Sequence, residues 1–99
     1  MEVSILTPDK KLFEGTADRV GAPGTDGEFE VLADHAPLVA ALAPGIVLVT
    51  AGRDVTSIDI SGGFIEVIDN RISLIVQQGT TPIALDGSDS DDESSDDSE

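Results

Sequence analysis

The sequence predicts an all-β domain, a sandwich or a barrel, on three observations. Short runs that alternate polar with apolar residues, or that are rich in β-branched residues, recur along the chain. Turn signals rich in Gly, Pro, Asn and Asp separate these runs about every eight to twelve residues. No stretch has a convincing helical pattern. Such a domain would occupy residues 1–85, because residues 86–99 contain no apolar side chain.

A hairpin and a third strand are the first elements expected. Residues 2–5 alternate as an edge-like strand, and residues 7–10 form a turn in which Pro8 presets the backbone. Residues 11–15 make the return arm of the hairpin, with Phe13 as its core anchor. The third strand is expected to run from Thr16 to Val20 and to stop at residues 21–24, where two glycines and a proline follow.

The stretch from Asp26 to Gly45 is the most individual part of the chain. Asp26 and Gly27 signal a turn, and residues 28–31 alternate as a half-buried strand does. The apolar run at residues 38–43 is ambiguous. Asp34 could cap a helix there, with Pro37 tolerated in its first turn, but a six-residue run between prolines suits a buried strand equally well.

The second half of the chain reads as four more strands. Residues 46–50 have the composition of a strand covered on both faces. Residues 55–60 follow, and Gly62 and Gly63 then permit a bulge or a close backbone approach. Residues 64–68 and 72–76 form a hairpin. The side chains expected to face the core from these strands are Ile58, Ile60, Ile72, Leu74 and Val76.

Charge and composition exclude several classes of protein. The formal net charge is −15, and 8 of the 20 acids lie in residues 86–99, which are expected to be a disordered acidic tail. So acidic a chain, with Phe as its only aromatic residue type, is not expected to bind nucleic acid. The absence of cysteine excludes a disulfide-stapled module. No signal peptide and no transmembrane segment are expected.

Residues that could carry chemistry are few. His35, Asp34 and Ser61 could suggest a nucleophilic triad, but no G-x-S-x-G elbow is present. A single histidine without cysteine lacks zinc-ligand spacing, so no catalytic residue, metal or cofactor is expected. The glycines at 21, 24 and 27 are interpreted as turn formers, because no Gly-Lys-Ser/Thr of a phosphate loop follows them.

Several motifs carry a resemblance to a known family. They are His-Ala-Pro-Leu at 35–38, Leu-Ala-Pro-Gly at 42–45, Ile-Ser-Gly-Gly-Phe-Ile-Glu-Val at 60–67, Leu-Thr-Pro at 6–8 and Leu-Phe-Glu-Gly at 12–15. In their order and spacing along the chain, these motifs resemble those of the epsilon subunit of F-type ATP synthases. The resemblance extends from residue 2 to residue 85. The resemblance implies an antiparallel β-sandwich of about 8–10 short strands, and therefore a strand at residues 38–43.

The resemblance also implies a function. Members are non-catalytic rotor subunits of the central stalk in a proton- or sodium-translocating enzyme, on the cytoplasmic face of the bacterial inner membrane. They pack on the gamma subunit and on the ring of c subunits, in a complex with alpha and beta, and we expect the isolated chain to be monomeric. The matching positions are Glu28, near the polar loops of the ring, and His35, Ala36, Pro37 and Leu38, in the region that approaches gamma.

The sequence also departs from the family pattern. Glu30 and Val31 stand where Gly-Ile is typical, and Ala33 and Asp34 stand where Pro-Gly is frequent. Members usually continue into a pair of helices that can block hydrolysis and, in some, bind ATP. Only acidic residues, serines and one glycine follow Leu85 here, so neither property is expected. The alternative class is a β-sandwich with an acidic tail that binds basic proteins, as histone chaperones do.

Overall fold

The computed structural model describes residues 1–77 and 83–84, which form ten strands and no helix. The acidic tail and the domain boundary expected at Leu85 lie outside the described residues. The strands are β1 (Glu2–Leu6), β2 (Lys11–Thr16), β3 (Arg19–Gly24), β4 (Gly27–Leu32), β5 (Leu38–Leu42), β6 (Gly45–Ala51), β7 (Asp54–Ile60), β8 (Gly63–Ile68), β9 (Arg71–Val76) and β10 (Ile83–Ala84).

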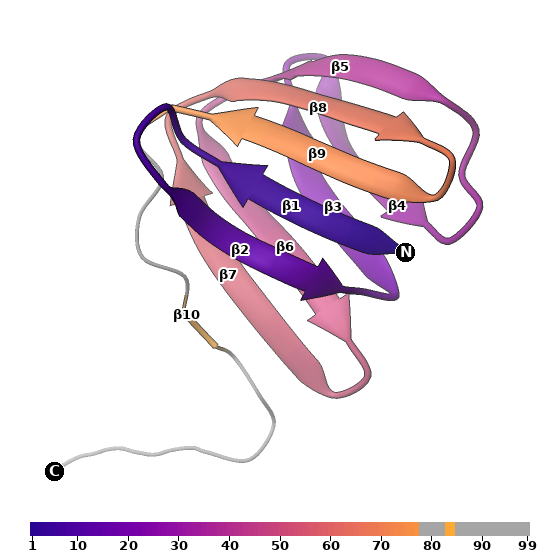
Figure 1. Ribbon diagram of the computed structural model, residues 1–99. Helices are drawn as coiled ribbons and strands as arrows, with labels where there is room; N and C mark the ends of the chain where they lie inside the picture. The colour runs from indigo at the N-terminus through magenta and orange to yellow at the C-terminus, as the bar shows by residue number, and fades with distance from the viewer. Residues whose placement is uncertain (78–82, 85–99) are drawn as a thin grey trace, which may run out of the picture.

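The strands form one continuous ladder that folds over into two layers (Figure 1). We call β5–β8–β9–β1–β2 the front layer, and β3, β4, β6, β7 and β10 the back layer. The layers join where β3 changes partner: residues 19–21 pair with β6, and Gly24 pairs with Leu42 of β5. Every pair is antiparallel except β1 with β9, which is parallel. The all-β sandwich expected from the sequence is confirmed.

Two strand assignments from the sequence are wrong. β1 is not at an edge, because it pairs with β2 on one side and with β9 on the other. The third strand does not run from Thr16 to Val20 but from Arg19 to Gly24, and Thr16 is the last residue of β2. Pro23 is accommodated because it lies where β3 leaves β6 and reaches β5, so no ladder bond requires its missing N–H. Its carbonyl oxygen accepts a hydrogen bond from the Ala43 amide at 2.7 Å.

The core between the layers is aliphatic. Sixteen apolar side chains are buried, from Val3 in β1 to Val76 in β9, and no polar or charged side chain is buried among the described residues. The core includes all five side chains of β7 and β9 that the sequence predicts to face inward. Phe13 is the exception to the predicted core: it is half-buried and packs against the core, because β2 is the edge strand of the front layer.

The structure decides two further interpretations. Residues 38–43 contain the strand β5 and no helix; β5 pairs with β8 at all of its positions. The strand at residues 46–50 is confirmed as β6, but it is not covered on both faces. Val47 and Val49 are buried, whereas Ile46 is 54% exposed and Leu48 is 40% exposed. Composition could not show this difference, because β-branched and leucine residues suit either face of a strand.

Glycines fix the backbone at two strand connections. Gly63 begins β8 with φ +144°, and a Cβ there would collide with the carbonyl of Ile75 and lie 2.7 Å from Cα of Val76. Gly52, in the β6–β7 turn, has φ +63°, but a Cβ there would meet nothing within 4 Å. The predicted close approach at Gly63 is therefore confirmed. Of the glycines at 21, 24 and 27, Gly21 lies inside β3 and forms no turn. Gly24 ends β3 and Gly27 begins β4, so these two flank the turn of residues 25–26, and Gly27 has φ +128°.

The two glycines give a matched test of this close approach. Gly63→Ala should lower the free energy of unfolding by about 3 kcal/mol, because strain at positive φ is joined by a clash with rigid backbone. Gly52→Ala should cost only about 1 kcal/mol, since it introduces the same backbone strain without the clash. Urea unfolding of both variants measures the difference. Equal losses would show that the neighbouring strand does not restrict residue 63.

Candidate functional site

The predicted site residues His35, Ala36 and Pro37 lie in the loop of residues 33–37, which joins β4 to β5. All five loop residues are exposed. The loop begins with a turn in which the His35 amide donates to the Leu32 carbonyl at 3.2 Å. The His35 ring lies against the backbone of the next residue, with its Nδ1 2.7 Å from the carbonyl oxygen of Ala36. The structure thus places His35 in an exposed loop.

Leu38 follows this loop as the first residue of β5. It is half-buried, packs against the core and pairs with Val67 of β8. Leu38 therefore anchors the end of the loop to the front layer, and only part of its side chain is available to a partner.

Glu28 lies apart from the other predicted site residues. It is the second residue of β4, opposite Pro23 of β3, and it is exposed. The loop of residues 33–37 begins at the other end of β4, after Leu32. At a rise of about 3.4 Å per residue, the four steps from residue 28 to residue 32 span about 14 Å. The predicted residues therefore form two places at opposite ends of one strand, not a single site.

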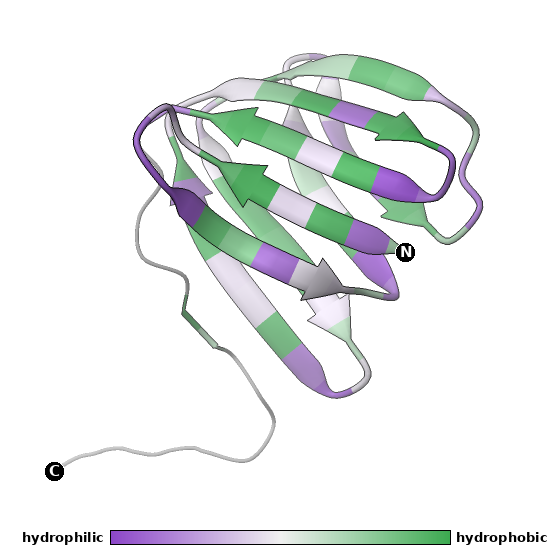
Figure 2. Cartoon of the chain, viewed as in Figure 1, coloured by the Kyte–Doolittle hydropathy of each residue, from purple (hydrophilic) through white to green (hydrophobic). Residues whose placement is uncertain are grey.

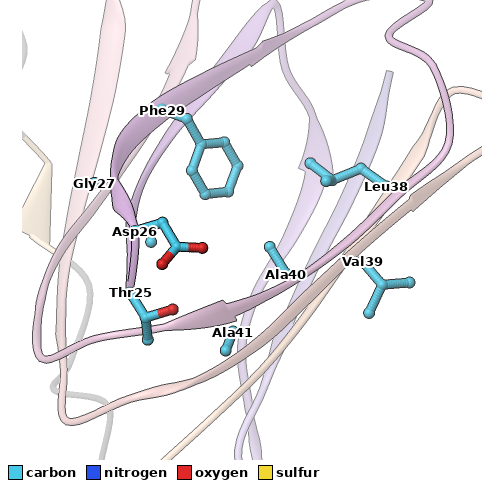
Figure 3. A pocket seen from close by; sticks show the side chains of 9 residues that line it. Thr25, Asp26, Gly27, Phe29, Leu38, Val39, Ala40 and Ala41 are labelled. Atoms are coloured by element: carbon cyan, nitrogen blue, oxygen red, sulfur yellow. The ribbon is translucent and has the colours of Figure 1, made fainter.

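A hollow of about 410 Å³ lies between the β3–β4 turn and β5 (Figure 3). The ring of Phe29 and the side chain of Leu38 face it from two sides, and the Asp26 carboxylate lies beside the ring. Phe29 is half-buried. The hollow has the chemistry to take an apolar side chain next to an acidic group. Leu38 is its only lining residue among the positions predicted from the sequence, which did not indicate Phe29.

The outer face of the front layer carries a row of apolar side chains. Ala41, Phe64, Ile75 and Leu6 lie in register across β5, β8, β9 and β1. Phe64 is 61% exposed and Ile75 is 57% exposed, and Val39, beside this row on β5, is 71% exposed. In Figure 2, β5, β8 and β9 are largely hydrophobic. We call these five residues the front row.

The back layer has a second, smaller apolar area. Ile46 and Leu48 of β6 line a hollow of about 360 Å³ together with Phe29 and Glu28. Glu30, next along β4, forms an ion pair with Arg19 at 3.7 Å, and both side chains are half exposed. An exposed pair of this kind contributes little to stability. The back layer thus combines apolar side chains with the carboxylates of β4.

Groups that could perform chemistry are not assembled in the described part of the chain. His35 lies in the β4–β5 loop and Ser61 lies in the β7–β8 connection, so the structure places them on different connections. Within residues 1–77 and 83–84 there is no cluster of three potential metal-ligating side chains and no helix that could cross a membrane. The distinctive features of this surface are its apolar areas and the two ends of β4.

These observations define a small β-sandwich domain with an aliphatic core and apolar outer faces. Residues 1–82 match the family model described as "ATP synthase, Delta/Epsilon chain, beta-sandwich domain". The chain belongs to this family, as its motifs suggest.

Relatives of similar sequence are ATP synthase epsilon chains. The epsilon chain of Leptospira borgpetersenii serovar Hardjo-bovis is 40% identical over 79 residues, which cover 80% of this chain and 62% of that protein. The epsilon chain of Salinibacter ruber is 41% identical over 86 residues, covering 78% of this chain and 58% of that protein. The chain thus spans about six tenths of the length of these relatives.

Solved structures support the same fold. A chain in the mitochondrial ATP synthase of Euglena gracilis, described as OSCP/F1/c-ring, superposes with a TM-score of 0.75 at 28% identity, covering 81% of this chain and 51% of that one. A chain in the central stalk/c-ring of the Tetrahymena thermophila enzyme gives a TM-score of 0.66 at 21% identity, covering 80% and 64%. At 21% identity, the match to the Tetrahymena chain supports the fold alone.

Phe64 and Ile65 are neighbours in β8 that face opposite sides of the front layer, Phe64 toward solvent and Ile65 toward the core. Substituting each of them tests this assignment. Phe64→Ala should change the free energy of unfolding by no more than about 1 kcal/mol, because the ring is largely in solvent. Ile65→Ala should cost about 2–5 kcal/mol, because it leaves a cavity in the core. Chemical denaturation of both variants measures the two losses. A loss for Phe64→Ala as large as that for Ile65→Ala would contradict the assignment of Phe64 to the outer face.

Proposed function

We propose that this chain is an epsilon-type central-stalk subunit of an F-type ATP synthase. It would perform no chemistry itself and would couple ion flow to ATP synthesis by holding rotor parts together. The observation that carries the proposal is a β-sandwich of this family whose aliphatic core leaves every charged group of the described residues, and several large apolar side chains, on the outside. Exposed apolar areas of this kind mark interaction surfaces.

The two ends of β4 suggest how one small domain would contact two partners. In the proposal, His35, Ala36, Pro37 and the exposed part of Leu38 contact the gamma subunit. Glu28, at the other end of the strand, contacts the polar loops of the c-ring. The separation of about 14 Å along β4 supports this division, because it leaves room for each group of residues to face a different subunit.

The fold also suits a part that transmits force. β4 is hydrogen-bonded along its whole length to β3, and β3 in turn is paired with both β6 and β5. A load applied at Glu28 would therefore pass through several ladders rather than through one loop. With alpha and beta in the same complex, the chain would be peripheral to the membrane on the cytoplasmic face of the bacterial inner membrane. The coupled ion would be a proton or sodium.

Affinity isolation from native membranes tests the class of protein. The tagged chain should recover the ATPase alpha, beta, gamma and c subunits, and the free chain should elute as a monomer in gel filtration. Recovery of histone-like basic proteins, together with a stable pentamer, would instead favour the alternative acidic-tail binding protein. Recovery of no partner would also contradict the proposal.

A charge in the β4–β5 loop tests the gamma contact. His35→Asp should weaken binding to gamma at least about tenfold, because a carboxylate without a partner is costly inside an interface. The melting temperature should stay unchanged, since His35 is exposed in the free chain. Binding to an alpha–beta–gamma complex, followed by calorimetry, measures the affinity.

Arg53→Asp provides a stringent control, because it lowers the net charge by two units where His35→Asp lowers it by one. It introduces aspartate at another exposed loop position, in the β6–β7 turn. This control should bind as the native chain does. An equal weakening in both variants would mean that added negative charge, and not the position of residue 35, disturbs the complex.

A further inference from the structure

The turn between β8 and β9 has an asparagine, Asn70, at a position where the backbone favours glycine. The β8–β9 hairpin closes through Asp69 and Asn70, with φ +50° and +61°. Positive φ at both central residues is the signature of a type I′ turn, for which Asp-Gly and Asn-Gly are the favoured pairs. Glycine would therefore suit position 70 best by backbone preference alone. An asparagine there calls for a reason in its side chain.

The side chain of Asn70 connects this turn to the β4–β5 loop. Its Oδ1 accepts a hydrogen bond from the Asp34 amide at 2.9 Å, across 36 residues of sequence. Its backbone carbonyl accepts from the Glu2 amide at 3.1 Å, where β1 begins. One residue thus ties together the β8–β9 turn, the start of β1 and the loop of residues 33–37, and Figure 1 shows the turn beside the β4–β5 connection.

The loop depends on this contact because little else holds it. All five of its residues are exposed, so packing does not fix their positions. Asp34 is itself at φ +63°, a conformation that non-glycine residues adopt only when their surroundings hold them there. The other hydrogen bonds of the loop in the described residues are local, from His35 to Leu32 and within His35 and Ala36. The Asp34–Asn70 bond is therefore the link between the loop and the body of the domain.

We infer that Asn70 is a positioning residue for the partner contact at residues 34–37. Its Oδ1 holds the Asp34 amide and so keeps His35, Ala36 and Pro37 in one arrangement before a partner arrives. Ordering a contact loop in advance raises affinity, because less conformational freedom is lost on binding. The inference rests on the proposed gamma contact of this loop, and Asn70 acts through the loop without touching the partner.

Two substitutions separate the side-chain role from the turn role. Asn70→Gly keeps the positive φ and gives the favoured Asp-Gly turn but removes the acceptor. Asn70→Asp keeps an acceptor oxygen at the same place. Measurements at about 0.3 M salt limit the repulsion of its added charge by Asp34 and Asp69. Each variant is measured for its melting temperature, for hydrogen exchange of the Asp34 amide and for affinity to an alpha–beta–gamma complex.

The expected pattern is specific. Asn70→Gly should melt at the native temperature or above it, exchange the Asp34 amide faster, and bind about tenfold more weakly. Asn70→Asp should restore amide protection, with an affinity within about threefold of the native value. A merely structural role would instead move melting temperature and affinity together.

The outcomes that overturn the inference are distinct from those that overturn the proposed function. The positioning role would be contradicted if Asn70→Gly bound with native affinity, or if Asn70→Asp bound as weakly as Asn70→Gly. Either result could occur while His35→Asp still weakens the complex, and the proposed gamma contact would then stand. If His35→Asp binds as the native chain does, the proposed gamma contact itself fails. The exchange rate of the Asp34 amide then still decides whether Asn70 orders the loop, since that measurement needs no partner.

Discussion

The burial of aliphatic side chains between two layers of one continuous ladder is the constraint on which the rest of this structure depends. Because the layers belong to a single ladder, β3 must change partner along its length, and Pro23 and Gly24 lie where it does so. Because the core accepts no polar side chain among the described residues, their carboxylates and the histidine stay outside.

The surface has two kinds of feature on which the proposed contacts with partners rest. The front row and the area around Ile46 and Leu48 leave large apolar side chains in solvent on opposite layers. The ends of β4 add the exposed carboxylate of Glu28 at one side and the exposed loop around His35 at the other. In the proposed role, the sandwich between these features would hold neighbouring subunits at a fixed spacing.

Local patterns were sufficient for most of the fold but not for the arrangement of the site. Alternation placed Ile58, Ile60, Ile72, Leu74 and Val76 correctly, because one side of each strand faces an aliphatic core. The extent of β3 and the exposure of Ile46 could not be read locally, since both depend on which strand or layer lies next to them. The resemblance assigns Glu28 and His35 to different partners, but only the length of β4 shows how far apart the two residues lie. The bond from Asn70 to Asp34 joins segments 36 residues apart, which no periodicity reveals.

The central claim is that the two ends of β4 meet two different subunits, and site-directed cross-linking tests it most directly. The chain contains no cysteine, so a cysteine at position 28, 35 or 53 gives a single thiol for a photoactivatable reagent. In the assembled enzyme, a reagent at position 35 should join gamma, one at position 28 should join a c subunit, and one at position 53 should join neither. Cross-linking of positions 28 and 35 to the same subunit, or of neither to any subunit, would contradict the account.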